Sequence, residues 1–305
     1  MAGMNPMVVG GAGFIGSHLV DRLLAEGHAT EVVDDLSTSS LGNLAGARGA
    51  GGSLKIHTLD VRGGDLASLV GMRRPDVIYH LALLTPGQAR HDREGTAITS
   101  ALAVLEAARL HGVGKVVVAL PAGRLYGEIP QRELPAKESR PFQPLGLRGL
   151  LARTVTDLLT LYRDEYSVEY TALAMSTVYG PRQRSTDGVV ASFAEAIASG
   201  QPLVIHGDGR QSRDLLFVDD AVDALVRAGQ RGSGLVVNVG TGVQTAIRDL
   251  AALMDPSAGV VNTARRPGDL TRLAIAPTRA RIHLQWSPWT DLASGVASTI
   301  ESFRG

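Results

Sequence analysis

Short apolar runs alternate with helix-length amphipathic segments along most of the chain. The runs occupy residues 7–9, 31–34, 54–59, 77–80, 115–120, 168–173 and 235–239. Strand-like runs separated by helices are typical of βαβ units, in which the strands are parallel. The pattern therefore predicts an α/β fold built on a Rossmann-type, doubly wound parallel sheet.

Two of the helix-length segments have apolar residues at helical spacing, from about residue 94 to 111 and from about 145 to 166. Each also carries apolar residues off its main stripe, such as Leu150 and Leu159 in the second segment. These side chains either pack on a second subunit, which leaves a homodimer open, or widen the face that the helix turns to the core.

The alternation weakens after residue 179. Glycine and proline punctuate the chain at residues 200–202, 207–209 and 266–269, which predicts a loop-rich smaller lobe. We expect residues 1–178 and 215–245 to form a dinucleotide-binding domain, and residues 179–214 and 246–305 to form the substrate lobe. Such a lobe would cover the carboxyl ends of the strands, where ligands bind in open α/β sheets.

A glycine-rich segment lies between the first apolar run and an amphipathic helix, where residues 10–16 read GGAGFIG. Glycines in this place permit a tight turn and let backbone N–H groups approach a pyrophosphate at the helix N-terminus. Asp34 ends the second apolar run, where an acidic residue would hydrogen-bond the adenosine ribose. The two signals predict a dinucleotide coenzyme, and a glycine turn that only packs a helix on the sheet is the less favoured interpretation.

The composition argues against several classes of function. The 305 residues are 44% hydrophobic and include 30 basic and 30 acidic residues, so no net charge recruits nucleic acid or an anionic membrane. No cysteine is present, which excludes disulfides, a thiolate nucleophile and sulfur ligands for a metal. With no secretory hydrophobic region and no apolar run of membrane-spanning length, we expect a cytoplasmic protein with a small-molecule substrate.

Motifs along nearly the whole chain resemble those of extended short-chain dehydrogenase/reductases of the NAD-dependent epimerase/dehydratase type. The matching segments are residues 10–16, 34–36, 60–61, 80–82, 125–127, 178–183, 207–209, 213–214, 218–220 and 266–269. The combination is far more specific than the glycines alone. The resemblance implies a Rossmann domain with a smaller C-terminal substrate lobe, and NAD(P)H as the coenzyme.

The resemblance also implies individual coenzyme contacts. Asp60 would hydrogen-bond the adenine, and the backbone of Leu81 and Ala82 would pass beside the nicotinamide ribose. Asp34 would repel a ribose 2′-phosphate and so favours NADH, although the serines that follow it leave NADPH open. The full predicted set is Gly10, Gly13, Phe14, Ile15, Gly16, Asp34, Asp35, Leu36, Ser37, Asp60, Val61, Leu81, Ala82, Leu83 and Ser176.

The catalytic residues of that family are missing from their positions. Its Ser/Thr, Tyr and Lys fall at Ala122, Leu145 and Gly149, and no tyrosine in the chain is followed four positions later by lysine. We therefore assign no catalytic residue. Hydride transfer to a ketone creates an alkoxide that needs a proton, and losing a positioned acid costs roughly 10²- to 10⁴-fold in rate.

These features lead to the expectation of an atypical NAD(P)H-dependent ketoreductase. It would reduce a ketone on a bulky, aromatic polyketide-like (angucyclinone-type) natural product in antibiotic biosynthesis, with the proton supplied by the substrate or by water. Two alternatives stay open: a catalytically silent NAD(P)-binding sensor and a nucleotide-sugar-modifying enzyme. The second draws on Arg213, Arg266 and Asp269, which match residues that hold the nucleotide diphosphate in relatives, whereas Thr177 replaces their usual Asn.

The predicted substrate contacts are Tyr126, Arg148, Thr177, Tyr179 and Arg213. The two tyrosine positions chiefly support loops in the family, so direct proton transfer from either is the less favoured role. Arg148 either faces the cleft as an electrostatic donor or faces solvent. We expect no metal site, because His91 and Glu94 stand at helical spacing without a third ligand nearby.

Overall fold

The computed structural model describes residues 3–83 and 95–304. Its centre is a seven-stranded sheet in the order β11-β6-β5-β4-β1-β2-β3, in which every neighbouring pair is parallel. The strands are β1 (Pro6–Val9), β2 (Thr30–Asp34), β3 (Leu54–Thr58), β4 (Val77–His80), β5 (Lys115–Pro121), β6 (Tyr170–Met175) and β11 (Leu235–Val239). They coincide with the seven apolar runs, which confirms the predicted α/β fold with a doubly wound parallel sheet.

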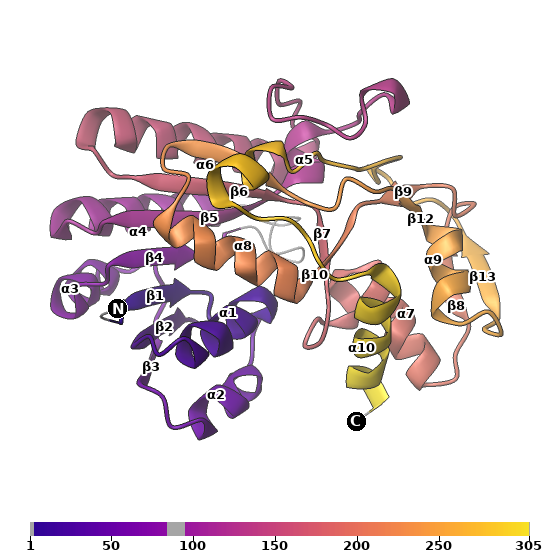
Figure 1. Cartoon of the computed structure of the whole chain (residues 1–305), viewed down its shortest axis with the longest axis horizontal. Helices are drawn as coiled ribbons and strands as arrows, with labels where there is room; N and C mark the ends of the chain where they lie inside the picture. Colours follow the sequence, from indigo (N-terminus) through magenta and orange to yellow (C-terminus); the bar gives the residue numbers. More distant parts are fainter. Residues whose placement is uncertain (1–2, 84–94, 305) are drawn as a thin grey trace.

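Helices cover both faces of this sheet (Figure 1). On one face lie α1 (Phe14–Ala25) and α8 (Val218–Gln230), and on the other lie α3 (Asp65–Arg73), α4 (Thr96–His111) and α6 (Gly146–Tyr166). Successive β1 side chains enter different cores: Val8 packs in the first and Met7 and Val9 in the second. Strands buried on both faces have largely apolar sequences, whereas the edge strand β3 is half-exposed and includes Lys55 and His57.

The smaller lobe lies to one side of the sheet and contains three two-stranded sheets (Figure 1). The pairs are β7 (Thr177–Tyr179) with β10 (Leu215–Phe217), β8 (Leu203–His206) with β13 (Val260–Thr263), and β9 (Ser212–Arg213) with β12 (Thr245–Ala246). Helices α7 (Val189–Ala198), α9 (Ile247–Met254) and α10 (Leu292–Arg304) pack around them. The lobe is therefore more regular than the loop-rich one expected, and the domain boundaries remain a prediction.

The apolar residues of α6 divide between core and surface. Leu159 is 1% exposed and packs in the core, which corrects its candidacy for a subunit contact, whereas Leu150 is 56% exposed. The homodimer remains a prediction. Within residues 3–83 and 95–304, no helix has both the length and the apolar character that crossing a membrane requires.

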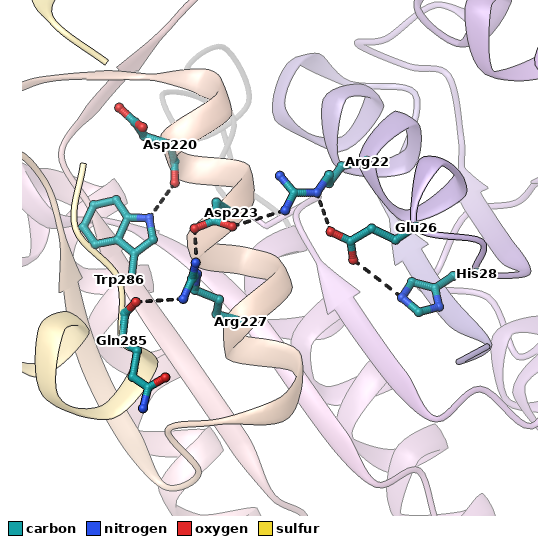
Figure 2. A network of polar contacts seen from close by, with 8 residues as sticks. All are labelled: Arg22, Glu26, His28, Asp220, Asp223, Arg227, Gln285 and Trp286. Atoms are coloured by element: carbon teal, nitrogen blue, oxygen red, sulfur yellow. Dashed lines mark hydrogen bonds and ion pairs between the residues drawn. The ribbon is translucent and has the colours of Figure 1, made fainter. Parts of the chain in front are cut away.

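A polar network ties α8 to α1 and to the segment before α10 (Figure 2). The buried carboxylate of Asp223 accepts a hydrogen bond from Arg227 Nε at 2.7 Å and lies 3.4 Å from Arg22 Nη2 on α1. Arg22 also pairs with Glu26 of its own helix, and Arg227 Nη1 donates to the carbonyl of Gln285 at 2.7 Å. Asp223 therefore fixes the position of α8 against two other segments.

We expect Asp223→Ala to lower the free energy of unfolding by about 2 kcal/mol, because it leaves two guanidinium groups facing each other. Solvent screens part of this repulsion, since the side chains of Arg22 and Arg227 are 40% and 39% exposed. Urea unfolding measures the change. Asp157→Ala is the control: it breaks an exposed pair with Arg153 on α6 and should cost less than about 0.5 kcal/mol. Equal losses in the two variants would contradict the prediction.

Candidate coenzyme and substrate site

The turn between β1 and α1 leaves no room for side chains. Gly10 has a φ angle of +82°, and a Cβ atom there would lie 2.9 Å from the backbone N of Ala82. A Cβ atom on Gly16 would lie 2.1 Å from the carbonyl O of Gly10. Only glycine fits at either place, so backbone approaches backbone as the predicted tight turn requires.

The N-terminus of α1 opens beside this turn. The helix begins at Phe14 with Gly13 as its N-cap, and no side chain of the described residues caps it. Its first N–H groups stand at the point between β1 and β4 where the strand order reverses. A pyrophosphate bound here would accept these N–H groups and gain from the helix dipole.

Asp34 ends β2 at the same edge of the sheet and is 8% exposed. Its carboxylate accepts hydrogen bonds from the Ala12 N–H at 2.9 Å, the Leu36 N–H at 2.9 Å and the Ser39 hydroxyl at 2.6 Å. A carboxylate accepts about four hydrogen bonds, so capacity remains for a ribose hydroxyl. The fixed negative charge also disfavours a ribose 2′-phosphate.

The remaining residues predicted to bind the coenzyme border the same edge. Asp60 and Val61 follow β3, and the hydrogen bond from Arg62 lowers the pKa of the Asp60 carboxyl. Residues 81–83 follow β4 and approach the glycine turn through Ala82, and Asp35 accepts a hydrogen bond from the Ser37 N–H. The hydroxyl of Ser176, after β6, is buried and has no hydrogen-bond partner among the described residues, so it is available to a ligand.

The three positions of the missing catalytic residues lie where α5 (Ala122–Tyr126) meets the start of α6. Ala122 begins α5, Leu145 precedes α6, and Gly149 lies in the first turn of α6. The carbonyl O of Arg124 accepts the N–H of Leu145 at 2.8 Å and lies 2.4 Å from where a Cβ atom of Gly149 would be. The two helices therefore touch through their backbones at the position of the family's lysine, and no side chain fits there without movement.

Two of the residues predicted to contact substrate are buried tyrosines. Tyr126 donates to Asn238 Oδ1 at 2.8 Å, and Tyr179 packs edge-on against Phe217. Burial raises the pKa of both phenols, so neither is suited to exchange protons at neutral pH. Their geometry favours loop support. Thr177 begins β7, the short strand that ends at Tyr179, and it is half-buried.

Arg213 and the residue that follows it each make fixed contacts in the smaller lobe. Asp214 is buried, which raises the pKa of its carboxyl, and it accepts hydrogen bonds from the N–H and the hydroxyl of Thr241 at 2.8 Å. Arg213 then donates through Nη1 to the carbonyl of Leu270 at 2.9 Å, while Nη2 lies 3.9 Å from Asp269. A fixed guanidinium with donors to spare suits an anionic ligand.

A pocket of about 310 Å³ opens in the same lobe. Its lining comprises Gly207, Asp208, Arg210, Gln211, Arg265, Thr271 and Arg272. Arg265 lies near enough to Arg213 to help lower the pKa of that guanidinium, for which burial is the larger cause. The concentration of arginines gives the pocket the character of a phosphate-binding site.

Two further arginines lie nearer the missing catalytic positions. Arg124 Nη1 donates to the carbonyl of Gly268 at 2.8 Å and so joins α5 to the smaller lobe. Arg148 has a buried Nε without a hydrogen-bond partner within residues 3–83 and 95–304. Burial, aided by the charge of Arg124, lowers the pKa of Arg148 to about 10, so it stays protonated at neutral pH. Arg148 as a whole is half-buried, and its predicted placement in the cleft or towards solvent remains a prediction. Arg124 could not be identified as a functional residue from the sequence, because it belongs to no recognisable motif.

No cluster of three or more side chains suited to bind a metal occurs in the part of the chain that the structure describes. His91 and Glu94, the pair weighed as metal ligands, lie outside the described residues.

The reversal of strand order at the glycine turn and the buried Asp34 are features of a dinucleotide-binding α/β protein, and an arginine-lined pocket lies in its smaller lobe. Residues 7–240 match the model of the NAD dependent epimerase/dehydratase family, and the chain belongs to this family. It is 40% identical to the UDP-glucose 4-epimerase of Mycolicibacterium smegmatis over 314 residues, covering 99% of each chain.

Solved structures agree with this assignment. The chain is similar to UDP-glucose 4-epimerase from Thermotoga maritima with UDP-glucose, with a TM-score of 0.92, 32% identity and 99% of each chain covered. It is also similar to UDP-glucose 4-epimerase from Thermus thermophilus in complex with NAD, with a TM-score of 0.89, 30% identity and 99% of each chain covered.

These comparisons confirm the predicted family and its NAD coenzyme. They do not support the finer prediction of a ketoreductase acting on aromatic polyketides in antibiotic biosynthesis, because the relatives named above are UDP-sugar epimerases. That prediction drew on the missing catalytic residues at Ala122, Leu145 and Gly149, which do not identify a substrate. The comparisons instead favour the nucleotide-sugar alternative.

Proposed function

We propose that this chain is an NAD-dependent nucleotide-sugar-modifying enzyme of the UDP-sugar 4-epimerase type. One observation carries the proposal: the chain combines a coenzyme cradle at the ends of the parallel strands with an arginine-lined pocket in the smaller lobe. Arg124, which follows β5, reaches Gly268 of that lobe and shows that the two parts meet at this edge. Relatives that bind UDP-glucose and NAD support the proposal.

In this proposal the smaller lobe binds the nucleotide part of the substrate, and the sugar lies beside the coenzyme. Arg213, held by the carbonyl of Leu270, and the pocket arginines would bind the nucleotide diphosphate. The sugar would then lie towards Ala122 and Leu145, beside the coenzyme. NAD, when bound, accepts and returns a hydride at a sugar carbon.

Removal of a hydride from a sugar alcohol also requires loss of the hydroxyl proton. Ala122, Leu145 and Gly149 have no group that takes this proton, so the substrate or an ordered water has to accept it. The absence of a positioned base costs roughly 10²- to 10⁴-fold in rate. A second candidate, a silent protein that binds NAD and a nucleotide sugar, is favoured by the backbone contact that blocks a lysine at Gly149.

Calorimetry of the NAD-loaded chain with UDP and UDP-glucose, followed by an assay for the C4 epimer, tests the proposal. We expect both ligands to bind, and turnover roughly 10²- to 10⁴-fold below that of an epimerase with a complete triad. Arg213→Gln should weaken UDP binding by about 10- to 100-fold through loss of charge-assisted hydrogen bonds. Arg132→Gln is the control, since that side chain is 86% exposed.

The outcomes separate the candidates. Binding of both ligands without any turnover supports the silent binding protein. Failure of UDP and UDP-glucose to bind the NAD-loaded chain contradicts the proposal, and oxidation of NADH by a phenolic ketone would restore the ketoreductase.

A further inference from the structure

Arg148 lacks a counterion in the described part of the protein. The side chain of Arg148 makes no hydrogen bond or ion pair with any residue in the ranges 3–83 and 95–304, and its Nε is buried. The charged residues with most influence on it are Arg124, of like sign, and Asp187. Asp187 is already paired with Arg184, which donates to its two oxygens at 2.7 and 3.1 Å.

The position of Arg148 on α6 places it close to the reaction centre. It stands three residues after Leu145, and residues at this spacing lie on the same face of a helix. Leu145 occupies the position of the family's tyrosine. Arg124 is also a neighbour of Leu145, since its carbonyl O accepts the Leu145 N–H while its guanidinium reaches Gly268. Both arginines are therefore near the position of the family's tyrosine.

A half-buried guanidinium whose Nε has no partner is unfavourable, because this N–H has lost hydration and gained no hydrogen bond in return. A bound anion would remove this cost. The diphosphate already has Arg213 and the pocket arginines in the smaller lobe. The charge of Arg148 is therefore left for a second anionic group at the sugar end of the substrate. A carboxylate matches the planar, bidentate geometry of a guanidinium.

We propose that the sugar of the nucleotide sugar carries a carboxylate, as in a uronic acid, and that Arg148 binds this carboxylate. The inference rests on the proposed function, because the nucleotide and NAD sites define where the sugar lies. The charge of Arg124 adds attraction while its Nη1 stays bonded to Gly268.

Equilibrium binding to the NAD-loaded full chain tests the inference with UDP, UDP-glucose and UDP-glucuronate at one ionic strength. We expect UDP-glucuronate to bind about 10- to 100-fold more tightly than UDP-glucose. Arg148→Gln should abolish this preference and leave the affinities for UDP and UDP-glucose within about twofold of the wild type, since neither carries the carboxylate. Arg153→Gln on the same helix is the matched control: Arg153 is exposed and paired with Asp157, so the preference should persist.

The three ligands separate the two proposals. If UDP and UDP-glucose bind but UDP-glucuronate binds no more tightly, or if Arg148→Gln keeps the preference, the carboxylate inference is overturned and the proposed function stands. If none of the three ligands binds, the proposed function fails. Because Arg148 has no protein partner in the described ranges, Arg148→Gln should unfold at no lower temperature than the wild type. A lower unfolding temperature would assign the guanidinium to the fold and overturn the inference.

Discussion

Joint replacement of Ala122 by Ser and Leu145 by Tyr is expected to raise the turnover of UDP-glucose by about 10²- to 10⁴-fold. The two hydroxyls would return a proton acceptor to the positions that lack one. UDP-glucose has no carboxylate, so the charge of Arg148 remains free to stabilise the phenolate of the new tyrosine. Formation of the C4 epimer in the presence of NAD measures the gain.

The hydroxyl, rather than the aromatic ring, has to produce this gain. Ala122→Ser with Leu145→Phe is therefore the matched control and should stay at the wild-type rate. Addition of Gly149→Lys should undo the gain, because its Cβ atom would lie 2.4 Å from the Arg124 carbonyl and force α5 and α6 apart. We expect that variant to lose about 3 kcal/mol of stability. A Ser/Tyr variant that binds both ligands but turns over no faster would show that more than the acid–base group is missing.

The parallel sheet could be predicted because its strands are apolar on both faces and therefore contrast with the segments between them. The first residue of a strand is harder to predict than the strand itself. β6 begins at Tyr170 rather than at residue 168, because α6 ends in a left-handed cap at Ser167 with a φ angle of 57° and the Val168 N–H bonds back to Tyr162. A serine in this conformation gives no sequence signal of the kind that glycine gives.

The smaller lobe could not be predicted in the same way. Strands of two to four residues show no measurable periodicity, and their pairing spans long stretches of chain. His206 of β8, for example, lies opposite Thr263 of β13. Such pairing is decided by tertiary packing, which a local pattern does not contain.

The candidate site divides along similar lines. Gly10 and Gly16 could be identified because backbone geometry demands that residue type at those places. The burial of Tyr126 could not, since it depends on Asn238 from a distant strand. The role of Arg124 could be identified only from its hydrogen bond to Gly268, which lies 144 residues further along the chain. Site residues whose role depends on the local backbone could be predicted from the sequence. Site residues whose role depends on distant partners could be identified only from the three-dimensional structure.

Gly16→Ala is expected to abolish NAD binding and to lower stability by at least about 3 kcal/mol. A Cβ atom at this position would lie 2.1 Å from the carbonyl O of Gly10 and 2.8 Å from the Cα atom of Gly11. Backbone atoms cannot rotate out of the way as a flexible side chain can. The turn would open or α1 would move off β1, and either change takes the helix N–H groups away from the pyrophosphate. Calorimetry with NAD and thermal unfolding measure the two effects.

Gly46→Ala is the control, because it makes the same Gly-to-Ala replacement at a position where a Cβ atom has room. A Cβ atom there meets no atom within 4 Å, and the residue lies in α2 (Ala45–Gly49), so the substitution should be neutral or stabilise by up to about 1 kcal/mol. Saturating NAD raises the unfolding temperature of any variant that binds it, because the ligand stabilises only the folded state. The wild type and Gly46→Ala should show this rise and Gly16→Ala should not. If NAD raised the unfolding temperature of Gly16→Ala as much as that of the wild type, NAD binding would not depend on the glycine turn. The coenzyme site would then lie elsewhere.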